Sequence, residues 1–180
     1  MNLLKKAIIN IVLILVAFLI YFLQSNFFTW FNIAGIMPNL FVILVLFIGL
    51  FANKIVGGIY GIVIGFFLDL VIGTKIGIYA LGLGLIGFLA GALDKNFSKD
   101  SRITIMIMVL GATVVFEVIA YFFNYMLSDI NVEIFNFIRI LLIEVIFNLI
   151  LTIIIYPLIQ KFGYIIENEY KGNKILTRYF

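Results

Sequence analysis

The sequence contains no cysteine and no histidine. Without cysteine, the chain has neither a disulfide framework nor a thiolate metal site. Without histidine, it lacks the most common metal ligand and the most common general base of enzymes. It also has no phosphate-binding loop, no dinucleotide fingerprint and no basic nucleic-acid patch. We therefore expect a protein that is not an enzyme, with no cofactor, no metal and no nucleic-acid partner.

Charge is also scarce. Only 12% of the 180 residues are charged and 65% are hydrophobic, with a mean hydropathy of +1.26. A soluble domain has about a quarter of its residues charged. So few charges cannot cover a water-facing surface, so lipid must surround most of the chain. The composition predicts an all-α integral membrane protein.

The apolar residues fall into separate segments, and a helix needs about 20 of them to cross a bilayer. The first apolar segment follows Lys5 and Lys6 but offers no cleavage site, so we interpret it as a retained span. The second segment is short and is either extended from near Ile36 or a partial crossing. We predict six transmembrane helices, at residues 7–23, 39–52, 55–72, 76–93, 103–127 and 137–159.

The basic residues predict the orientation of these spans. If the N-terminus is cytoplasmic, the outer segments carry only Lys75 and Arg139. This bias matches the positive-inside rule and places both termini in the cytoplasm. The outer stretch 24–38 is uncharged and aromatic, which favours a short interfacial helix or a re-entrant turn, with a recognition loop as the alternative. The inner segments carry Lys5, Lys6, Lys54, Lys95, Lys99, Arg102, Lys161, Lys171, Lys174 and Arg178.

Glycine is concentrated in two predicted spans. Gly57, Gly61 and Gly65 form one stripe at four-residue spacing, and a second stripe of small residues follows on the next span. Small residues let helix backbones approach closely in lipid. The stripes indicate either packing within the bundle or a docking groove for a partner helix. The second stripe consists of Ala80, Gly84, Gly87 and Gly91.

A few polar side chains interrupt the apolar segments, and a charge in that position costs about 2.5–3.5 kcal/mol unless it is paired. We expect Arg139, the deep cation, to pair with Asp69 or with a glutamate. Polar residues recur at helical spacing on the last two spans, which predicts an inward-facing seam. The seam is either interhelical glue or a small outward-opening ligand cavity. The polar residues expected to be buried are Glu117, Asn124, Arg139, Glu144 and Asn148.

The order of motifs from Pro38 to Gly91 resembles the MreD family of rod shape-determining proteins. Pro38 and Asn39 open a span, a Gly-x-x-x-Gly helix follows with Asp69 near its end, and Gly73 and Gly77 bound a tight turn before a second glycine-bearing helix. By motif position, the family-matching residues are Pro38, Asn39, Gly61, Gly65, Asp69, Gly73 and Gly77.

The resemblance implies a non-catalytic scaffold of the bacterial cell-elongation and peptidoglycan-synthesis machinery in the cytoplasmic membrane. Its expected direct partner is an MreC-like bitopic protein. RodA, a class B penicillin-binding protein and, indirectly, MreB are further expected partners. A homodimer is a further possibility that the sequence leaves open. We expect a six-helix transmembrane domain at 1–163 and a cytoplasmic tail at 164–180.

The family fold is thought similar to the substrate-binding subunits of energy-coupling-factor transporters. A vitamin-type transport subunit is therefore the alternative function. Those subunits commonly carry an Ala-x-x-x-Ala motif on the first span, whereas here Ala7 and Ala17 lie ten residues apart. This departure makes the transport function the weaker hypothesis, and a shared fold does not transfer function.

Overall fold

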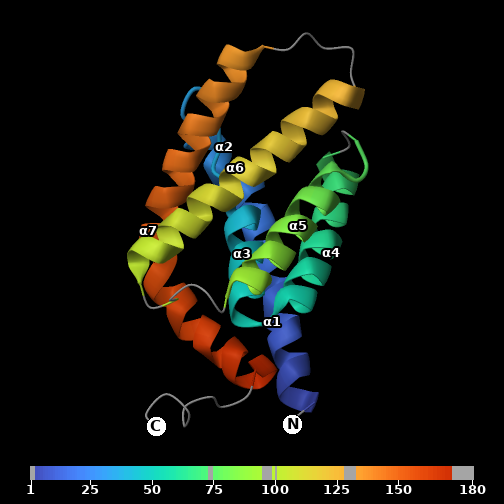
Figure 1. Cartoon of the computed structure of the whole chain (residues 1–180), viewed down its shortest axis with the longest axis vertical. Coiled ribbons are helices and arrows are strands. Elements are labelled where there is room, and N and C mark those ends of the chain that lie inside the picture. Colours follow the sequence, from blue (N-terminus) through green and yellow to red (C-terminus); the bar gives the residue numbers. More distant parts are fainter. Residues whose placement is uncertain (1–2, 73–74, 95–98, 100, 128–132, 172–180) are drawn as a thin grey trace.

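The computed structural model describes residues 3–72, 75–94, 99, 101–127 and 133–171. These residues form an all-helical bundle (Figure 1), and within those ranges the only β pairing is an isolated bridge between Ile33 and Ile36. The elements are α1 (Leu3–Phe22), the π-helical turn η1 (Leu23–Phe27), α2 (Phe28–Trp30), α3 (Leu40–Phe51), α4 (Lys54–Ile72), α5 (Ile78–Leu93), α6 (Arg102–Leu127) and α7 (Ile134–Lys171).

Each of the six predicted spans coincides with one of these helices, but the helices differ in length. Four helical stretches are long and apolar enough to cross a membrane: the continuous run Leu4–Trp30, α4, α6 and α7. The helices α3 and α5 are also apolar but shorter. At 1.5 Å of rise per residue, the 12 residues of α3 extend about 18 Å, well under the ~30 Å of a hydrocarbon core.

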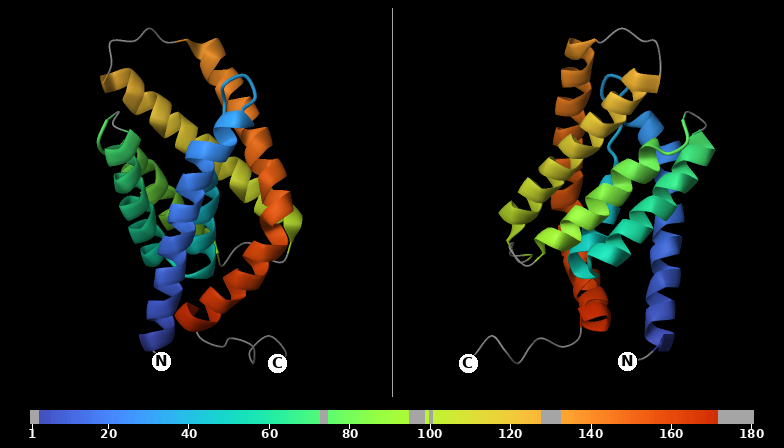
Figure 2. Two further views of the ribbon diagram at one scale, coloured as in Figure 1. Left: turned by 180° about the vertical axis from the view of Figure 1, so that it is seen from behind. Right: turned by 45° about the vertical axis from the view of Figure 1, so that its right-hand side comes forward.

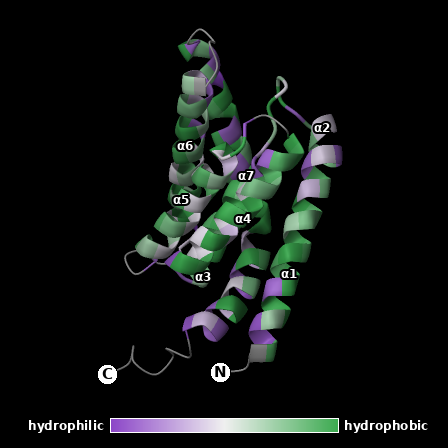
Figure 3. Cartoon of the chain, turned by 90° about the vertical axis from the view of Figure 1, so that its right-hand side faces the viewer, coloured by the Kyte–Doolittle hydropathy of each residue, from purple (hydrophilic) through white to green (hydrophobic). Residues whose placement is uncertain are grey.

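The start of α1 and the end of α7 lie at the same end of the bundle (Figure 2). We call this the terminal end and the opposite one the distal end. Hydrophilic residues gather where α1 begins and α7 ends, whereas the helix bodies are predominantly hydrophobic (Figure 3). This distribution fits a chain whose middle lies in lipid and whose terminal end reaches an aqueous surface.

The short helix α3 forms the centre of the molecule. Eleven of its 12 residues are buried, and it contacts α1, α4, α5, α6 and α7. An apolar helix surrounded by other helices needs no polar face, which explains its continuous hydrophobic sequence. The predicted second span is therefore a core helix that covers only part of the membrane depth.

The segment 31–39 connects the distal end to α3. The helical run that starts with α1 continues to Trp30, and the non-helical segment then turns back into the bundle (Figure 2). Ala34 and Gly35 take left-handed conformations in this turn, with φ of 54° and 82°. The stretch 24–38 thus consists of a helical piece followed by a segment that turns back into the bundle, and its place on the outer side stays a prediction.

The last helix, α7, is 38 residues long, so a straight helix would extend about 57 Å. Pro157 lies inside it, and the ribbon bends so that its final part runs beneath the bundle toward α1 (Figure 2). Proline bends a helix because it lacks an N–H and clashes with the preceding turn. The helix continues past residue 163, so residues 164–171 of the expected tail are helical, and the proposed domain division stays a prediction.

Candidate functional site

The glycines of α4 face the backbone of α5. A methyl group on Gly61 would overlap the carbonyl of Leu83, and one on Gly57 would overlap Gly87. Gly65 stands in the same relation to the backbone of Ala80. The two backbones therefore touch directly, as expected where missing side chains allow close helix packing in lipid.

The remaining glycines extend this contact to α3. A methyl group on Gly87 would overlap the carbonyl of Gly57, and one on Gly91 would overlap the backbone of Lys54, whereas Gly84 faces the Ile62 side chain. Gly49 on α3 is also packed tightly against α5, because a methyl group added to it would lie 2.9 Å from the Cβ atom of Ala90. The sequence does not mark Gly49, because it is the one glycine in its helix and forms no spacing pattern.

Asp69 holds the beginning of α5. Its carboxylate accepts hydrogen bonds from the backbone N–H groups of Gly77 at 2.9 Å, Tyr79 at 3.0 Å and Ala80 at 3.1 Å. Asp69 is 1% exposed, and Gly77 precedes the helix with φ of 109°. The carboxylate replaces the intrahelical acceptors that the first turn of α5 lacks, and the helix dipole favours a negative charge there.

Two residues that we expected to be buried are exposed. Arg139 and Asn124 both lie on the surface of the helices near the distal end. We expected Arg139 to pair with Asp69 or with a glutamate, and this is wrong. The α5 amides already satisfy Asp69, and the ion pairs of the described residues include none with Arg139. Gly73 lies outside the described residues.

The predicted polar seam exists between α3, α6 and α7. Asn148, which is fully buried, accepts a hydrogen bond from the backbone N–H of Asn39 at 2.8 Å and donates one to Thr113 Oγ1 at 2.9 Å. The side chain of Asn39 in turn accepts from the N–H of Val42 at 3.3 Å, which caps α3. Gln24 donates to the carbonyl of Pro38 at 3.1 Å. These contacts satisfy the non-helical backbone inside the bundle, as a membrane interior requires.

A pair of glutamates extends the seam toward the distal end. Glu144 is 6% exposed, and its carboxyl group is in hydrogen-bonding contact with Glu117 of α6. Glu144 also interacts with Asn39 and Asn148. Its Oε1 atom has no hydrogen-bond donor in the described part of the chain. The pair is thus an acidic site next to the N-terminus of α3.

An apolar groove of about 470 Å³ lies between α1 and α4, with Phe41 of α3 at its base. One end carries polar groups, because Asn10 Oδ1 accepts hydrogen bonds from the hydroxyls of Tyr60 at 2.9 Å and Tyr170 at 2.5 Å. The sequence does not mark this groove, because the groove depends on how α1 and α4 lie beside each other in the folded chain. Its walls are formed by Asn10, Leu13, Ile14, Ala17 and Phe18 of α1 and by Ile59, Tyr60, Val63, Ile64 and Phe67 of α4.

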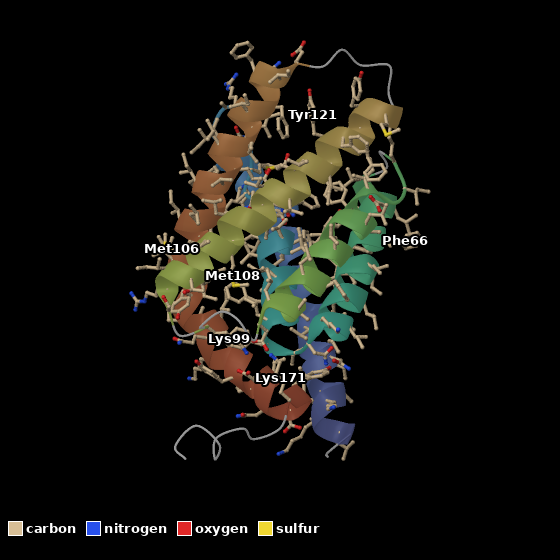
Figure 4. The ribbon with its side chains drawn as sticks, viewed as in Figure 1. Phe66, Lys99, Met106, Met108, Tyr121 and Lys171 are labelled. Carbon is tan, nitrogen blue, oxygen red and sulfur yellow. The ribbon has the colours of Figure 1, made fainter. Side chains whose placement is uncertain are left out.

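A cluster of ion pairs closes the terminal end. Asp94, at the end of α5, contacts Lys99 Nζ at 2.5 Å and Lys171 Nζ at 2.6 Å. Lys99 also meets Glu167 at 2.6 Å, and Lys171 donates to the carbonyl of Leu50 at 2.7 Å. Figure 4 shows Lys99 and Lys171 close together beneath the bundle. Because the charged residues of this cluster lie up to 77 positions apart, no local pattern could have paired them.

Burial by itself would lower the pKa of Lys99, but its hydrogen bonds to Asp94 and Glu167 outweigh burial and raise that pKa. The lysine therefore stays charged at neutral pH. The cluster is an anchor that joins α5, the segment before α6 and the end of α7 to the end of α3.

A comparison with protein-family models matches residues 5–163 to MreD, the rod shape-determining protein family. The match covers most of the chain. This chain belongs to the MreD family. The matched region 5–163 contains all the residues of the glycine contacts, the Asp69 cap and the polar seam, whereas Glu167 and Lys171 of the ion cluster lie beyond it. No curated protein and no solved structure matches the chain.

Family membership gives the chain a role in rod shape determination. MreD proteins are shape-determining structural proteins and are not a known enzyme family. The family and the four membrane-capable helices together indicate a multi-pass protein of the cytoplasmic membrane. Elongation and peptidoglycan synthesis are the processes that fit this family role.

Proposed function

We propose that this MreD-family chain is a non-catalytic membrane scaffold that binds the single transmembrane helix of an MreC-like partner. The binding surface in this proposal is the groove between α1 and α4. The partner, in turn, would join the chain to RodA and a class B penicillin-binding protein, with MreB as an indirect contact. The termini would lie in the cytoplasm, as the distribution of lysine and arginine suggests.

The groove supports this proposal because it leaves one face of each of two long helices uncovered. Only 6% of the apolar window of α1 is buried within the chain, and the adjoining face of α4 exposes Ile59 and Val63 by 55% and 61%. A helix inserted here would gain dispersion contacts with both walls, which is the main drive for association in lipid. Ala17 leaves room for close approach on the α1 wall.

The glycine stripes are unsuited to the same role. Their glycines contact the backbones of neighbouring helices inside the chain, so a partner could reach them only by separating α4 from α5. The opposite face of α4 lines the groove. We therefore assign the partner to the groove-facing surface of this helical hairpin and the glycines to holding the hairpin together.

The test is co-purification of the partner with groove variants. Ile59→Trp places a large side chain in the groove, and we expect it to reduce co-purification of a co-expressed MreC-like protein at least severalfold, because the indole occupies the space of the partner helix. The matched control is Ile103→Trp on α6, which is 70% exposed outside the groove. Equal recovery of the partner with both variants would exclude the groove as the binding surface.

The alternative function, a vitamin-type transport subunit, has one favourable observation. The helix α3 begins inside the bundle beside a buried polar seam, and broken helices of this type form substrate sites in transporters. Crosslinking of the native membrane followed by mass spectrometry separates the two functions. Peptides of MreC and RodA support the scaffold, whereas a coupling subunit with ATPases supports transport.

A further inference from the structure

The polar seam contains two carboxyl groups that the hydrogen bond at the entry of α3 does not use. Asn148 accepts from the backbone N–H of Asn39 just before α3 and is itself held by Thr113 of α6, so this bond at the entry of α3 involves neither Glu117 nor Glu144. Both side chains come from the middle of long helices, about 15 Å from the distal ends of α6 and α7 at 1.5 Å per residue. A different reason must keep two carboxyl groups in contact there.

The charge of this pair decides its chemistry. Two ionised carboxylates in hydrogen-bonding contact repel strongly where water is scarce, and one of them then keeps its proton. The ion pairs found among the described residues involve neither glutamate. Glu144 Oε1 has no donor among the described residues, so the pair has an acceptor available for a proton.

The surroundings favour one remaining negative charge. The N-terminus of α3 lies beside Glu144, through contact with Asn39, and the N-terminal end of a helix carries a partial positive charge. The titratable group that faces the pair from another element is Tyr79 of α5, which interacts electrostatically with both glutamates. On α6 itself, Tyr121 lies one turn from Glu117. Asp69 of α4 also interacts with Tyr79 but is held by backbone amides.

We propose that Glu117 and Glu144 form an intramembrane proton-binding site in which the two carboxyl groups hold one proton between them. The proton joins α6 to α7 across the distal half of the bundle. When it leaves, two negative charges remain in contact and push the helices apart. This site is independent of the partner groove, so either proposal can fail without the other.

The first test measures thermal stability against pH for the purified full chain in detergent. The folded pair holds a proton that free glutamates have already lost above about pH 4.3. Because the folded state binds more protons than the unfolded state, its stability falls as pH rises, by up to tenfold per pH unit in the folding equilibrium. We expect this fall in the wild type as pH rises above about 4.3, until the folded pair releases its proton.

The variants that isolate the pair are Glu144→Gln and Glu117→Gln. A glutamine donates its own hydrogen bond to the remaining carboxylate and needs no shared proton, so each variant should flatten the stability profile across this range. The matched control is Glu133→Gln, an exposed acid near the start of α7, which should keep the wild-type slope. Wild-type slopes in both pair variants would overturn the proposal.

A second test uses the wild type and avoids any dependence on folding of the variants. Dicyclohexylcarbodiimide reacts with a protonated carboxyl group in an apolar site: the acid proton passes to a carbodiimide nitrogen and the carboxylate oxygen bonds to the central carbon. The adduct rearranges to a stable acylurea with no leaving group. Mass spectrometry should find the adduct on Glu117 or Glu144, decreasing as pH rises. Its absence from both residues at every pH would overturn the proposal.

Discussion

At the scale of single residues, polar side chains in this protein mainly satisfy backbone groups in the apolar interior. Asp69 accepts three amides at the start of α5, and Asn148 joins the entry of α3 to α6. An unsatisfied N–H inside a bilayer has no water to bind, so each such contact matters more than it would on a soluble surface.

Replacing Asp69 by alanine should destabilise the detergent-solubilised protein. The change leaves the N–H groups of Gly77, Tyr79 and Ala80 without their acceptor, and a lost hydrogen bond to a charged group costs about 1.5–3 kcal/mol. Thermal denaturation followed by size-exclusion chromatography measures the effect. The control is Asn124→Ala, an exposed residue at the same end, and equal melting of the two variants would contradict this role of Asp69.

At the scale of helices, close backbone contact organises α3, α4 and α5. Most glycines of the two stripes on α4 and α5 are placed so that a single added methyl group meets backbone atoms of a neighbouring helix: Gly57, Gly61, Gly65, Gly87 and Gly91. Backbone atoms cannot move aside as a flexible side chain can, so any residue larger than glycine should destabilise the protein at these positions. The arrangement explains why a lipid-embedded hairpin contains so many residues that weaken an isolated helix.

Two glycine-to-alanine variants test this explanation. Gly61→Ala should lower the melting temperature because its methyl group overlaps the backbone of Leu83. Gly111→Ala on α6 is the matched control, since no neighbouring atom lies within 4 Å of its virtual Cβ. Alanine should leave stability there unchanged or raise it by about 0.5–1 kcal/mol, because alanine favours a helix. The reverse order of the two melting temperatures would exclude backbone contact as the reason for Gly61.

At the scale of the whole molecule, ion pairs hold the helices together at the terminal end. The polar seam and the Asp69 cap hold them together toward the distal end. The bend of α7 at Pro157 brings Lys171 and Glu167 beneath the bundle, where they meet Asp94 and Lys99. Their side chains are 12–27% exposed. Ion pairs this far from water depend on complete partners, because an unmatched charge is costly to bury.

The variant Asp94→Asn should therefore lower stability by roughly 2 kcal/mol, because it leaves Lys99 and Lys171 with only Glu167 between them. The contribution of Lys99, whose pKa is raised, is fully present below the ordinary lysine value of about 10.4 and is lost only as pH rises through the higher folded value. Burial lowers the pKa of the neighbouring Lys171, so the deficit is expected at neutral pH, where Lys99 is charged.

Thermal melting at several pH values measures this deficit. The matched control is Glu169→Gln, whose ion pair with Lys5 spans 3.7 Å and is more exposed, so its loss should change stability by at most about 1 kcal/mol. An Asp94→Asn variant as stable as this control would show that the cluster does not anchor the end of α7.

The positions of the helices could be predicted from the sequence because apolar length is a local property. Each predicted span coincides with a helix, and the polar residues of α7 at four-residue spacing, from Glu144 to Tyr156, are all buried as expected. The exposure of Arg139 could not be predicted from the sequence. Composition showed that a lone cation needs a partner, but only the packing revealed that backbone amides had already taken Asp69.

The sequence by itself determined that lipid surrounds this chain, that its helices are separated where they are, and that its motifs are those of the MreD family, because composition and spacing act locally. The tertiary structure alone decided that α3 is a partial, central helix, that α1 leaves a groove beside α4, and that Asp94 meets Lys171. These features depend on contacts between residues far apart in the chain, where the shape and charge of one helix select the neighbour of another.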